Sequence, residues 1–314
     1  MHLDAGVLRL SPSDLSAFLG CRHRTGLDLG VAHKVLERPA RNDSMLDALR
    51  DRGAKHEQAY VKNLLDQGLH VVEIDVNQSV ADRARATREA MAAGAEVVVQ
   101  AALVHDAWTG YADILRRVSV PSALGAWSYE PYDTKLARET RAGTILQLAV
   151  YVELLERQQG LRPDRFHVVT PGSGNGVSAM PGLPWPGSGA APLFTVNSYR
   201  YADFAAYFRV VRHQMLTMLA LGHDTVRDRH YPEPVEQCDV CRWWGRCNTQ
   251  RRADDHLSFI AGASRLHRHE LATRGYPTLA AAAAIPLPIA FKPSRGSRDA
   301  YARVREQARV QHQQ

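Results

Sequence analysis

Hydrophobic and polar positions alternate along this chain with two different periods. Some segments repeat apolar residues every three or four positions, as amphipathic helices do, and others alternate or run apolar, as strands do. Three of the strand segments follow one another through short linkers and predict an antiparallel meander. The predicted helices cover residues 43–66, 79–93, 139–158 and 201–222, and the predicted strands cover residues 70–76, 96–104, 110–118, 127–135, 165–170 and 193–200.

The two ends of the chain and one central segment depart from this pattern. Ser11 and Pro12 are typical of a helix start, as N-cap and first helical residue. Residues 171–192 are rich in Gly, Pro and Ser and predict an irregular loop. We therefore expect an α/β core over residues 1–253, with a mixed central sheet flanked by helices. Short helices and a basic, polar tail are expected over residues 254–314.

Composition adds few constraints. The chain has 314 residues, 45% hydrophobic and 23% charged, which is ordinary for a globular protein. It contains no apolar run of about eighteen residues and no signal peptide, so we expect no membrane association and a cytoplasmic location. A formal net charge of +6 permits a polyanionic partner such as nucleic acid.

The four cysteines have an uneven distribution. Cys21 stands alone, whereas Cys238, Cys241 and Cys247 form a C-x2-C-x5-C cluster. This spacing is typical of one four-thiolate metal site rather than of two disulfides. Four thiolates suit tetrahedral zinc as well as an iron–sulfur cluster, so the spacing alone leaves the metal open.

The candidate chemistry lies on the meander. Asp133 and Lys135 are two apart on one strand and therefore share a face. The carbonyl of Thr134, whose side chain is expected to face away, would lie at the edge of that site. Asp113, on the preceding strand, adds a second carboxylate. Two carboxylates and a lysine are suited to divalent-cation-dependent hydrolysis of a phosphodiester, although an exposed cross-strand charge pair is the simpler alternative for Asp133 and Lys135 alone.

Two predicted helices carry further candidates. His56 is a potential third metal ligand or else a surface histidine, and its neighbour Glu57 is an alternative ligand on another part of the helix surface. Gln147 and Tyr151 are four residues apart and share a helix face, where we expect them to flank the apolar residues. Their polar tips would reach a phosphate or a base, or would pack at the flank of the helix.

The order of these motifs resembles the RecB-like nucleases of the PD-(D/E)XK superfamily. The iron–sulfur branch, which includes the AddB-type and CRISPR-associated exonucleases, is the most similar. The resemblance covers roughly residues 10–250, and Asp133 stands where many relatives have Glu. Its motifs are Cys21, the G-x-x-H of Gly53 to His56, the G-x-x-D of Gly110 to Asp113, the D-x-K of Asp133 to Lys135, the Q-x-x-x-Y of Gln147 to Tyr151 and the C-x2-C-x5-C of Cys238 to Cys247.

The resemblance implies a restriction-endonuclease-like core and a role for each motif. Lys135 would be the catalytic lysine, and Gln147 and Tyr151 would position the nucleic-acid strand. A [4Fe–4S] cluster, with structural Zn²⁺ as the alternative, would be held by the cysteines. Trp243 and Trp244 would shield it, or would stack on single-stranded DNA. The implied Mg²⁺ or Mn²⁺ ligands are His56, Asp113, Asp133 and the carbonyl of Thr134, and the implied cluster ligands are Cys21, Cys238, Cys241 and Cys247.

The expected function is that of a Mg²⁺- or Mn²⁺-dependent deoxyribonuclease. It would act on single strands or duplex ends, in DNA repair, recombination or defence. Its partners would be DNA and, as in relatives of this type, a helicase or a second nuclease domain. The alternative is a non-catalytic module of the same fold that holds nucleic acid for a partner enzyme, and a third possibility is a zinc-bound scaffold.

Overall fold

The chain divides into two compact units, residues Met1–His230 and Tyr231–Gln314. The computed structural model describes residues 1–40, 43–137, 139–172, 193–227 and 229–313. The loop predicted at 171–192 therefore lies outside the described residues except for its first two positions. The division falls earlier than the predicted boundary at residue 253, because Tyr231 and Glu233 bond to Asp254 and His256 and so belong with the C-terminal residues.

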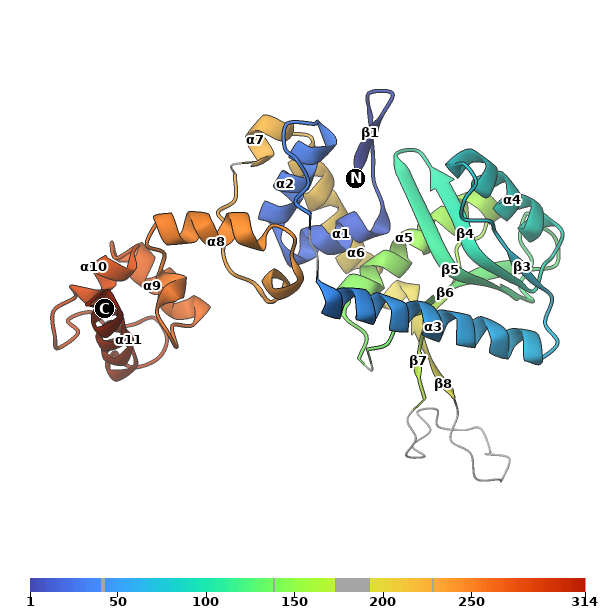
Figure 1. The fold of residues 1–314 in the computed structure, drawn as a ribbon. Coiled ribbons are helices and arrows are strands. Elements are labelled where there is room, and N and C mark those ends of the chain that lie inside the picture. The colour runs from blue at the N-terminus through green and yellow to red at the C-terminus, as the bar shows by residue number, and fades with distance from the viewer. Residues whose placement is uncertain (41–42, 138, 173–192, 228, 314) are drawn as a thin grey trace, which may run out of the picture. The chain divides into compact units, whose positions relative to one another are not determined.

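A mixed sheet of six strands forms the centre of the N-terminal unit, in the order β3-β4-β5-β6-β7-β8 (Figure 1). The predicted meander β4–β5–β6 is confirmed as antiparallel, β7–β8 is also antiparallel, and β3–β4 and β6–β7 are parallel. The prediction of a mixed sheet is therefore confirmed. The strands are β3 (Val71–Glu73), β4 (Val97–His105), β5 (Trp108–Val118), β6 (Ser128–Thr134), β7 (Arg165–Pro171) and β8 (Phe194–Arg200).

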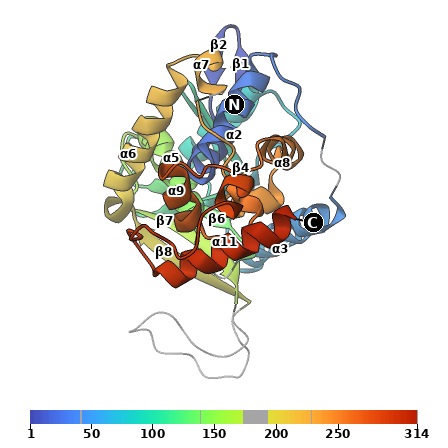
Figure 2. The ribbon, with the colours of Figure 1, turned by 90° about the vertical axis from the view of Figure 1, so that its left-hand side faces the viewer.

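Helices cover both faces of this sheet. On one face, α3 packs Tyr60 and Leu64 against a cluster that includes Ile114. On the other face, α5 contributes more residues to the larger core than any other element, and α6 lies alongside it (Figure 2). The helices of this unit are α1 (Pro12–Gly20), α2 (Arg22–Ala32), α3 (Ser44–Asp66), α4 (Val80–Ala92), α5 (Ala142–Gln159), α6 (Tyr201–Leu219) and α7 (His223–Arg227). A short hairpin, β1 (His2–Asp4) and β2 (Val7–Arg9), precedes them.

The periodic helices were predictable, and α2 was not. Its sequence, RHRTGLDLGVA, contains two glycines and several polar residues, which lower helix propensity and hide the periodicity. Burial of Leu27 and Leu29 stabilises it instead. Local propensity is therefore overridden by tertiary packing at this helix.

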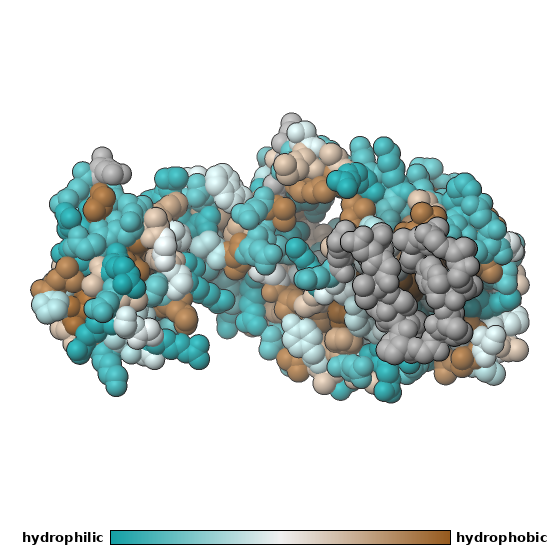
Figure 3. Space-filling model, turned by 90° about the horizontal axis from the view of Figure 1, so that it is seen from below, coloured by the Kyte–Doolittle hydropathy of each residue, from teal (hydrophilic) through white to brown (hydrophobic). Residues whose placement is uncertain are grey.

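The C-terminal unit is helical and has its own core. Its elements are η1 (Glu236–Val240), α8 (Trp244–Ala253), η2 (Leu257–Phe259), α9 (Arg265–Thr273), α10 (Leu279–Ala283) and α11 (Arg298–His312). The segment predicted to be a polar tail forms α11, because Tyr301, Val304 and Ala308 recur at helical spacing and are buried. On the face drawn in Figure 3, hydrophilic residues predominate on this unit, with separate hydrophobic areas between them. Among the helices that the structure describes, none is long and apolar enough to cross a bilayer.

Candidate active site

The site begins at the end of β6, with Asp133 and Lys135. Asp133 is fully buried, whereas the Lys135 side chain is 36% exposed. Lys135 Nζ lies 2.6 Å from Asp133 Oδ2, so the predicted pairing of the two side chains is confirmed. The pair therefore joins a buried carboxylate to a lysine that reaches solvent.

Asp113 joins this pair from the neighbouring strand β5. Its Oδ2 accepts a hydrogen bond from the Thr134 amide at 3.0 Å and a longer one from the Thr134 hydroxyl at 3.4 Å. The predicted convergence of the two strands is thus confirmed. The expectation that the Thr134 side chain faces away is wrong, because its hydroxyl turns to Asp113 and fixes that carboxylate beside β6.

The sheet is distorted beside Asp113, which lies in the middle of β5. Val98 and Ala101 belong to the same core cluster, although residues three apart on a regular strand face opposite sides. Ala112 and Leu115, which are three apart on β5, also belong to this one cluster, so both strands change the face that their side chains take. The shifts meet at Gln100, which has a φ of 55°, a left-handed value that is unusual for such a residue. The distortion therefore interrupts the alternation in both strands beside Asp113.

With this backbone conformation, the Gln100 side chain reaches helix α3. Its Nε2 donates a hydrogen bond of 2.5 Å to Glu57 Oε1. Glu57 in turn interacts electrostatically with Asp113 and Lys135. The motifs did not predict Gln100, but its sequence carries a signal, since it is the lone polar residue in the run VVVQAALV.

His56 lies within α3, as predicted, and faces strand β7. Its Nε2 lies 3.4 Å from the carbonyl oxygen of Val169, and its ring packs against Phe194 with 5.5 Å between ring centroids. The Val169 carbonyl also accepts the amide of Lys135. Among the described contacts of His56, none is to Asp113 or Asp133. Electrostatic interactions link Glu57 to the two aspartates, and the role of His56 as a cation ligand stays a prediction.

The electrostatics of the site follow from burial and crowding. Burial raises the pKa of Asp133 to about 7, opposed by Lys135 and reinforced by Asp113 and Glu57. Burial also raises the pKa of Glu57, and the charge of Asp113 adds to this effect. Burial alone would lower the pKa of Lys135, but the charges of Asp133 and Asp113 raise it above its ordinary value. The site thus concentrates negative charge that a lysine only partly compensates.

Gln147 and Tyr151 meet as predicted. Gln147 Nε2 lies 3.4 Å from Asp133 Oδ1 and donates to the Tyr151 hydroxyl at 3.1 Å. Tyr151 differs from its prediction, because it lies within the core at 3% exposure and donates to the carbonyl of Tyr111. Its ring also lies where a side chain at Gly110 would be. Tyr151 therefore holds Gln147 in place from inside the core.

The donor chemistry of the site suits a hard divalent cation. Asp113, Asp133 and Glu57 supply carboxylate oxygens, which Mg²⁺ and Mn²⁺ prefer. Asp133 Oδ2 is buried, and the Lys135 ammonium 2.6 Å away is the described group that partly compensates its charge. Within the described ranges, no three His, Cys, Asp or Glu side chains form a ready-made metal site. The carboxylates would therefore have to move closer together to share an ion.

The cysteines belong to different units. Cys21 follows α1 in the N-terminal unit and is the N-cap of α2, where its sulfur accepts the Arg24 amide at 3.4 Å. Cys238, Cys241 and Cys247 lie in the C-terminal unit, and Cys238 Sγ accepts the amide of Val235 at 3.4 Å. The four-thiolate site stays a prediction from the sequence.

Two comparisons with known proteins found no relative of this chain. No protein-family model matches this chain, and a search of curated proteins found no significant match. The functional interpretation therefore depends on the motifs and on the geometry of the side chains.

Proposed function

We propose that this protein is a Mg²⁺- or Mn²⁺-dependent deoxyribonuclease with a RecB-like core of the PD-(D/E)XK type. The observation that carries the proposal is the buried Asp133 carboxylate in an ion pair with Lys135, with Asp113 fixed beside it by Thr134. An exposed surface charge pair would not bury a carboxylate or collect two further acids around it. Burying these carboxylates together costs free energy of folding, and binding of a cation would offset that cost.

The reaction is hydrolysis of a phosphodiester. A water oxygen forms a bond to phosphorus, the phosphorus–oxygen bond to the leaving sugar breaks, and the leaving oxygen gains a proton. Lys135 is placed to orient this water or to stabilise negative charge that develops on the phosphate. Asp113, Asp133 and Glu57 would hold the cation. When bound, the cation would supply positive charge for the scissile phosphate and the leaving oxygen.

Gln147 and Tyr151 are assigned to positioning the substrate. Gln147 reaches the Asp133 carboxylate and has a partly exposed side chain, so it would contact the nucleic-acid strand directly. Tyr151 is buried and would act through Gln147. Single strands and duplex ends are the expected substrates, in repair, recombination or defence and with a helicase or second nuclease as partner.

The four cysteines are proposed to hold a [4Fe–4S] cluster with a structural role. The support is their spacing and the resemblance of the motifs that they enclose. Anaerobically purified protein should then be brown and contain iron and sulfide. A colourless protein containing zinc would instead identify the structural Zn²⁺ alternative.

The central test is cleavage of end-labelled single-stranded and duplex DNA by Asp133→Asn in Mg²⁺ or Mn²⁺. The variant should fold and should lose cleavage, because an amide cannot replace a carboxylate as a cation ligand. Asp106→Asn is the matched control, since Asp106 is exposed and lies between β4 and β5 at a left-handed φ that Asn tolerates. Cleavage by Asp133→Asn at the wild-type rate would refute the assignment, and binding without cleavage by the wild type would identify a non-catalytic module.

A further inference from the structure

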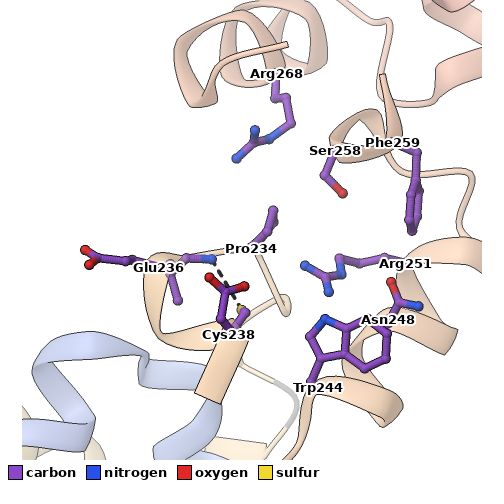
Figure 4. Close-up of a pocket in the computed structure, with 11 residues that line it drawn as sticks. Pro234, Glu236, Cys238, Trp244, Asn248, Arg251, Ser258, Phe259 and Arg268 are labelled. Carbon is purple, nitrogen blue, oxygen red and sulfur yellow. Dashed lines mark hydrogen bonds between the residues drawn. The ribbon is translucent and has the colours of Figure 1, made fainter. Parts of the chain in front are cut away.

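The C-terminal unit contains a cavity that the proposed nuclease site does not use. Its volume is about 420 Å³, within the usual range for small-ligand pockets. Residues of η1, α8, η2 and α9 line it, all of them within this unit. Its polar lining includes Trp244, Asn248, Arg251, Ser258 and Arg268 (Figure 4). The acidic residues Glu236 and Asp239 of η1 also line it.

Arg251 is the unusual residue of this cavity. It is only 3% exposed, and its Nε has no hydrogen-bond partner among the described residues. In the part of the chain that the structure describes, no carboxylate forms an ion pair with it either. A buried guanidinium without a counter-charge is strongly unfavourable, and arginine keeps its proton in proteins. The Arg251 Nε–H is therefore a buried donor that an anionic oxygen in the cavity would satisfy.

Arg268 adds a second guanidinium from the opposite wall. It donates to the carbonyl of Ala263 at 3.1 Å and lies 3.6 Å from the Glu233 carboxylate, so its charge is partly compensated. Its Nε is buried and has no partner among the described residues. Figure 4 shows both arginines reaching toward the same space, whereas Glu236 points away from it. Two guanidinium groups of this kind are suited to the oxygens of a phosphate.

Trp244 offers a contact for a base that is attached to such a phosphate. Its neighbour Trp243 is buried, as a side chain that shields the cysteine segment would be, but Trp244 is 50% exposed and lines the cavity. An exposed indole beside a phosphate site offers a stacking surface for a base. Ser258 and Asn248 supply neutral polar groups at the same wall.

The cavity borders the cysteine segment. Of the three cysteines of this unit, only Cys238 is among the residues that line it. We propose that this cavity binds one nucleotide unit of a single-stranded nucleic acid, with Arg251 and Arg268 on its phosphate and Trp244 on its base. The site would hold the strand independently of the carboxylates of the N-terminal unit.

The test is binding of three probes to the full-length protein without added divalent cation. The probes are a short thymidine oligonucleotide, thymidine 5′-monophosphate and inorganic phosphate. Arg251→Gln should weaken binding of all three by about tenfold or more, because it removes a charge-assisted contact. For the oligonucleotide, the slope of log affinity against log salt should fall by about 0.7, the contribution of one phosphate on a single strand.

Two variants separate this site from general charge and from simple phosphate binding. Arg246→Gln removes an exposed charge from the same helix and should leave binding of the monophosphate unchanged. Trp244→Leu should weaken the monophosphate and the oligonucleotide but not inorganic phosphate. Arg251→Met should fold at least as stably as the wild type, because it removes an unpaired buried charge.

Three results would overturn the proposal. The first is binding of the probes by Arg251→Gln as tight as by Arg246→Gln. The second is unchanged monophosphate binding by Trp244→Leu, and the third is competition by an acidic peptide as strong as that by the monophosphate. Since no cation is present, these outcomes are independent of cleavage. Failure of the Asp133→Asn test would equally leave this site standing.

Discussion

The two units of this protein bury polar groups of opposite sign. In the N-terminal unit, the Asp133 carboxylate is buried in a group of three carboxylates that one lysine only partly compensates. In the C-terminal unit, Arg251 is buried without a described counter-charge beside a second arginine. Each arrangement costs free energy in the protein alone and is relieved by a ligand of the opposite sign. The comparison is the basis of our proposal of a cation in one unit and an anion in the other.

The largest expected effect comes from removing the lysine of the carboxylate site. Lys135→Met should lower the cleavage rate by roughly 10²- to 10³-fold, the usual effect of deleting one group that stabilises developing charge. Lys62→Met is a matched control, because Lys62 pairs with Asp66 on the exposed surface of α3. Single-turnover cleavage with saturating DNA measures both variants. A rate for Lys135→Met equal to that of the control would remove Lys135 from the chemistry.

A change of pH should separate the two units. The pKa of Asp133 is raised to about 7 from an ordinary value near 3.8, so the folded state binds a proton that the unfolded state has lost. Its contribution to stability is therefore present at low pH and is lost as pH rises through about 7. Binding of Mg²⁺ needs the ionised carboxylate and should strengthen over the same range.

The arginine cavity should not follow this trend, because arginine stays charged throughout. Thermal unfolding between pH 5.5 and 8.5 measures the effect, with and without Mg²⁺, in the wild type and in Asp133→Asn. The increase in unfolding temperature caused by Mg²⁺ should grow with pH in the wild type and vanish in the variant. Oligonucleotide binding without cation should stay constant in both, and a parallel change would contradict the separation of the two sites.

The sequence predicted one of these regions much better than the other. Asp113, Asp133 and Lys135 were found because strand alternation and short linkers fix which residues converge. Glu57 was considered only as an alternative ligand, and Gln100 was not assigned to the site, because the distortion at Gln100 breaks the strand alternation on which that reasoning depends. Arg251 and Arg268 were missed for another reason. They come from separate helices, and no local spacing indicates that two such arginines share a cavity.

The carboxylate site also depends on close packing, which two motif glycines test. A Cβ at Gly110 would lie 2.7 Å from the ring of Tyr151, whereas a Cβ at Gly53 would meet nothing within 4 Å. Gly110→Ala should therefore lower the free energy of unfolding by about 1–3 kcal/mol, the typical cost of overpacking. Gly53→Ala should raise it by roughly 0.5–1 kcal/mol, because Gly53 lies inside helix α3. Denaturant unfolding compares them, and equal effects would show that Tyr151 is not packed against β5.

The smallest change in stability is expected at Gln100, where backbone strain and side-chain function can be separated. Gln100→Gly removes the hydrogen bond to Glu57 but suits the left-handed φ, so the free energy of unfolding should change by about 1 kcal/mol or less. Without its amide donor, Glu57 is free to turn from the aspartates, and Mg²⁺ affinity should fall by about tenfold. Gln100→Asn tolerates the same φ and keeps an amide, so it should recover part of that affinity. Calorimetric titration with Mg²⁺ measures the affinity of each variant. Unchanged affinity in Gln100→Gly would show that Gln100 has only a structural role in the sheet. A loss of Mg²⁺ affinity without a loss of stability would show that Gln100 orients Glu57 toward the cation.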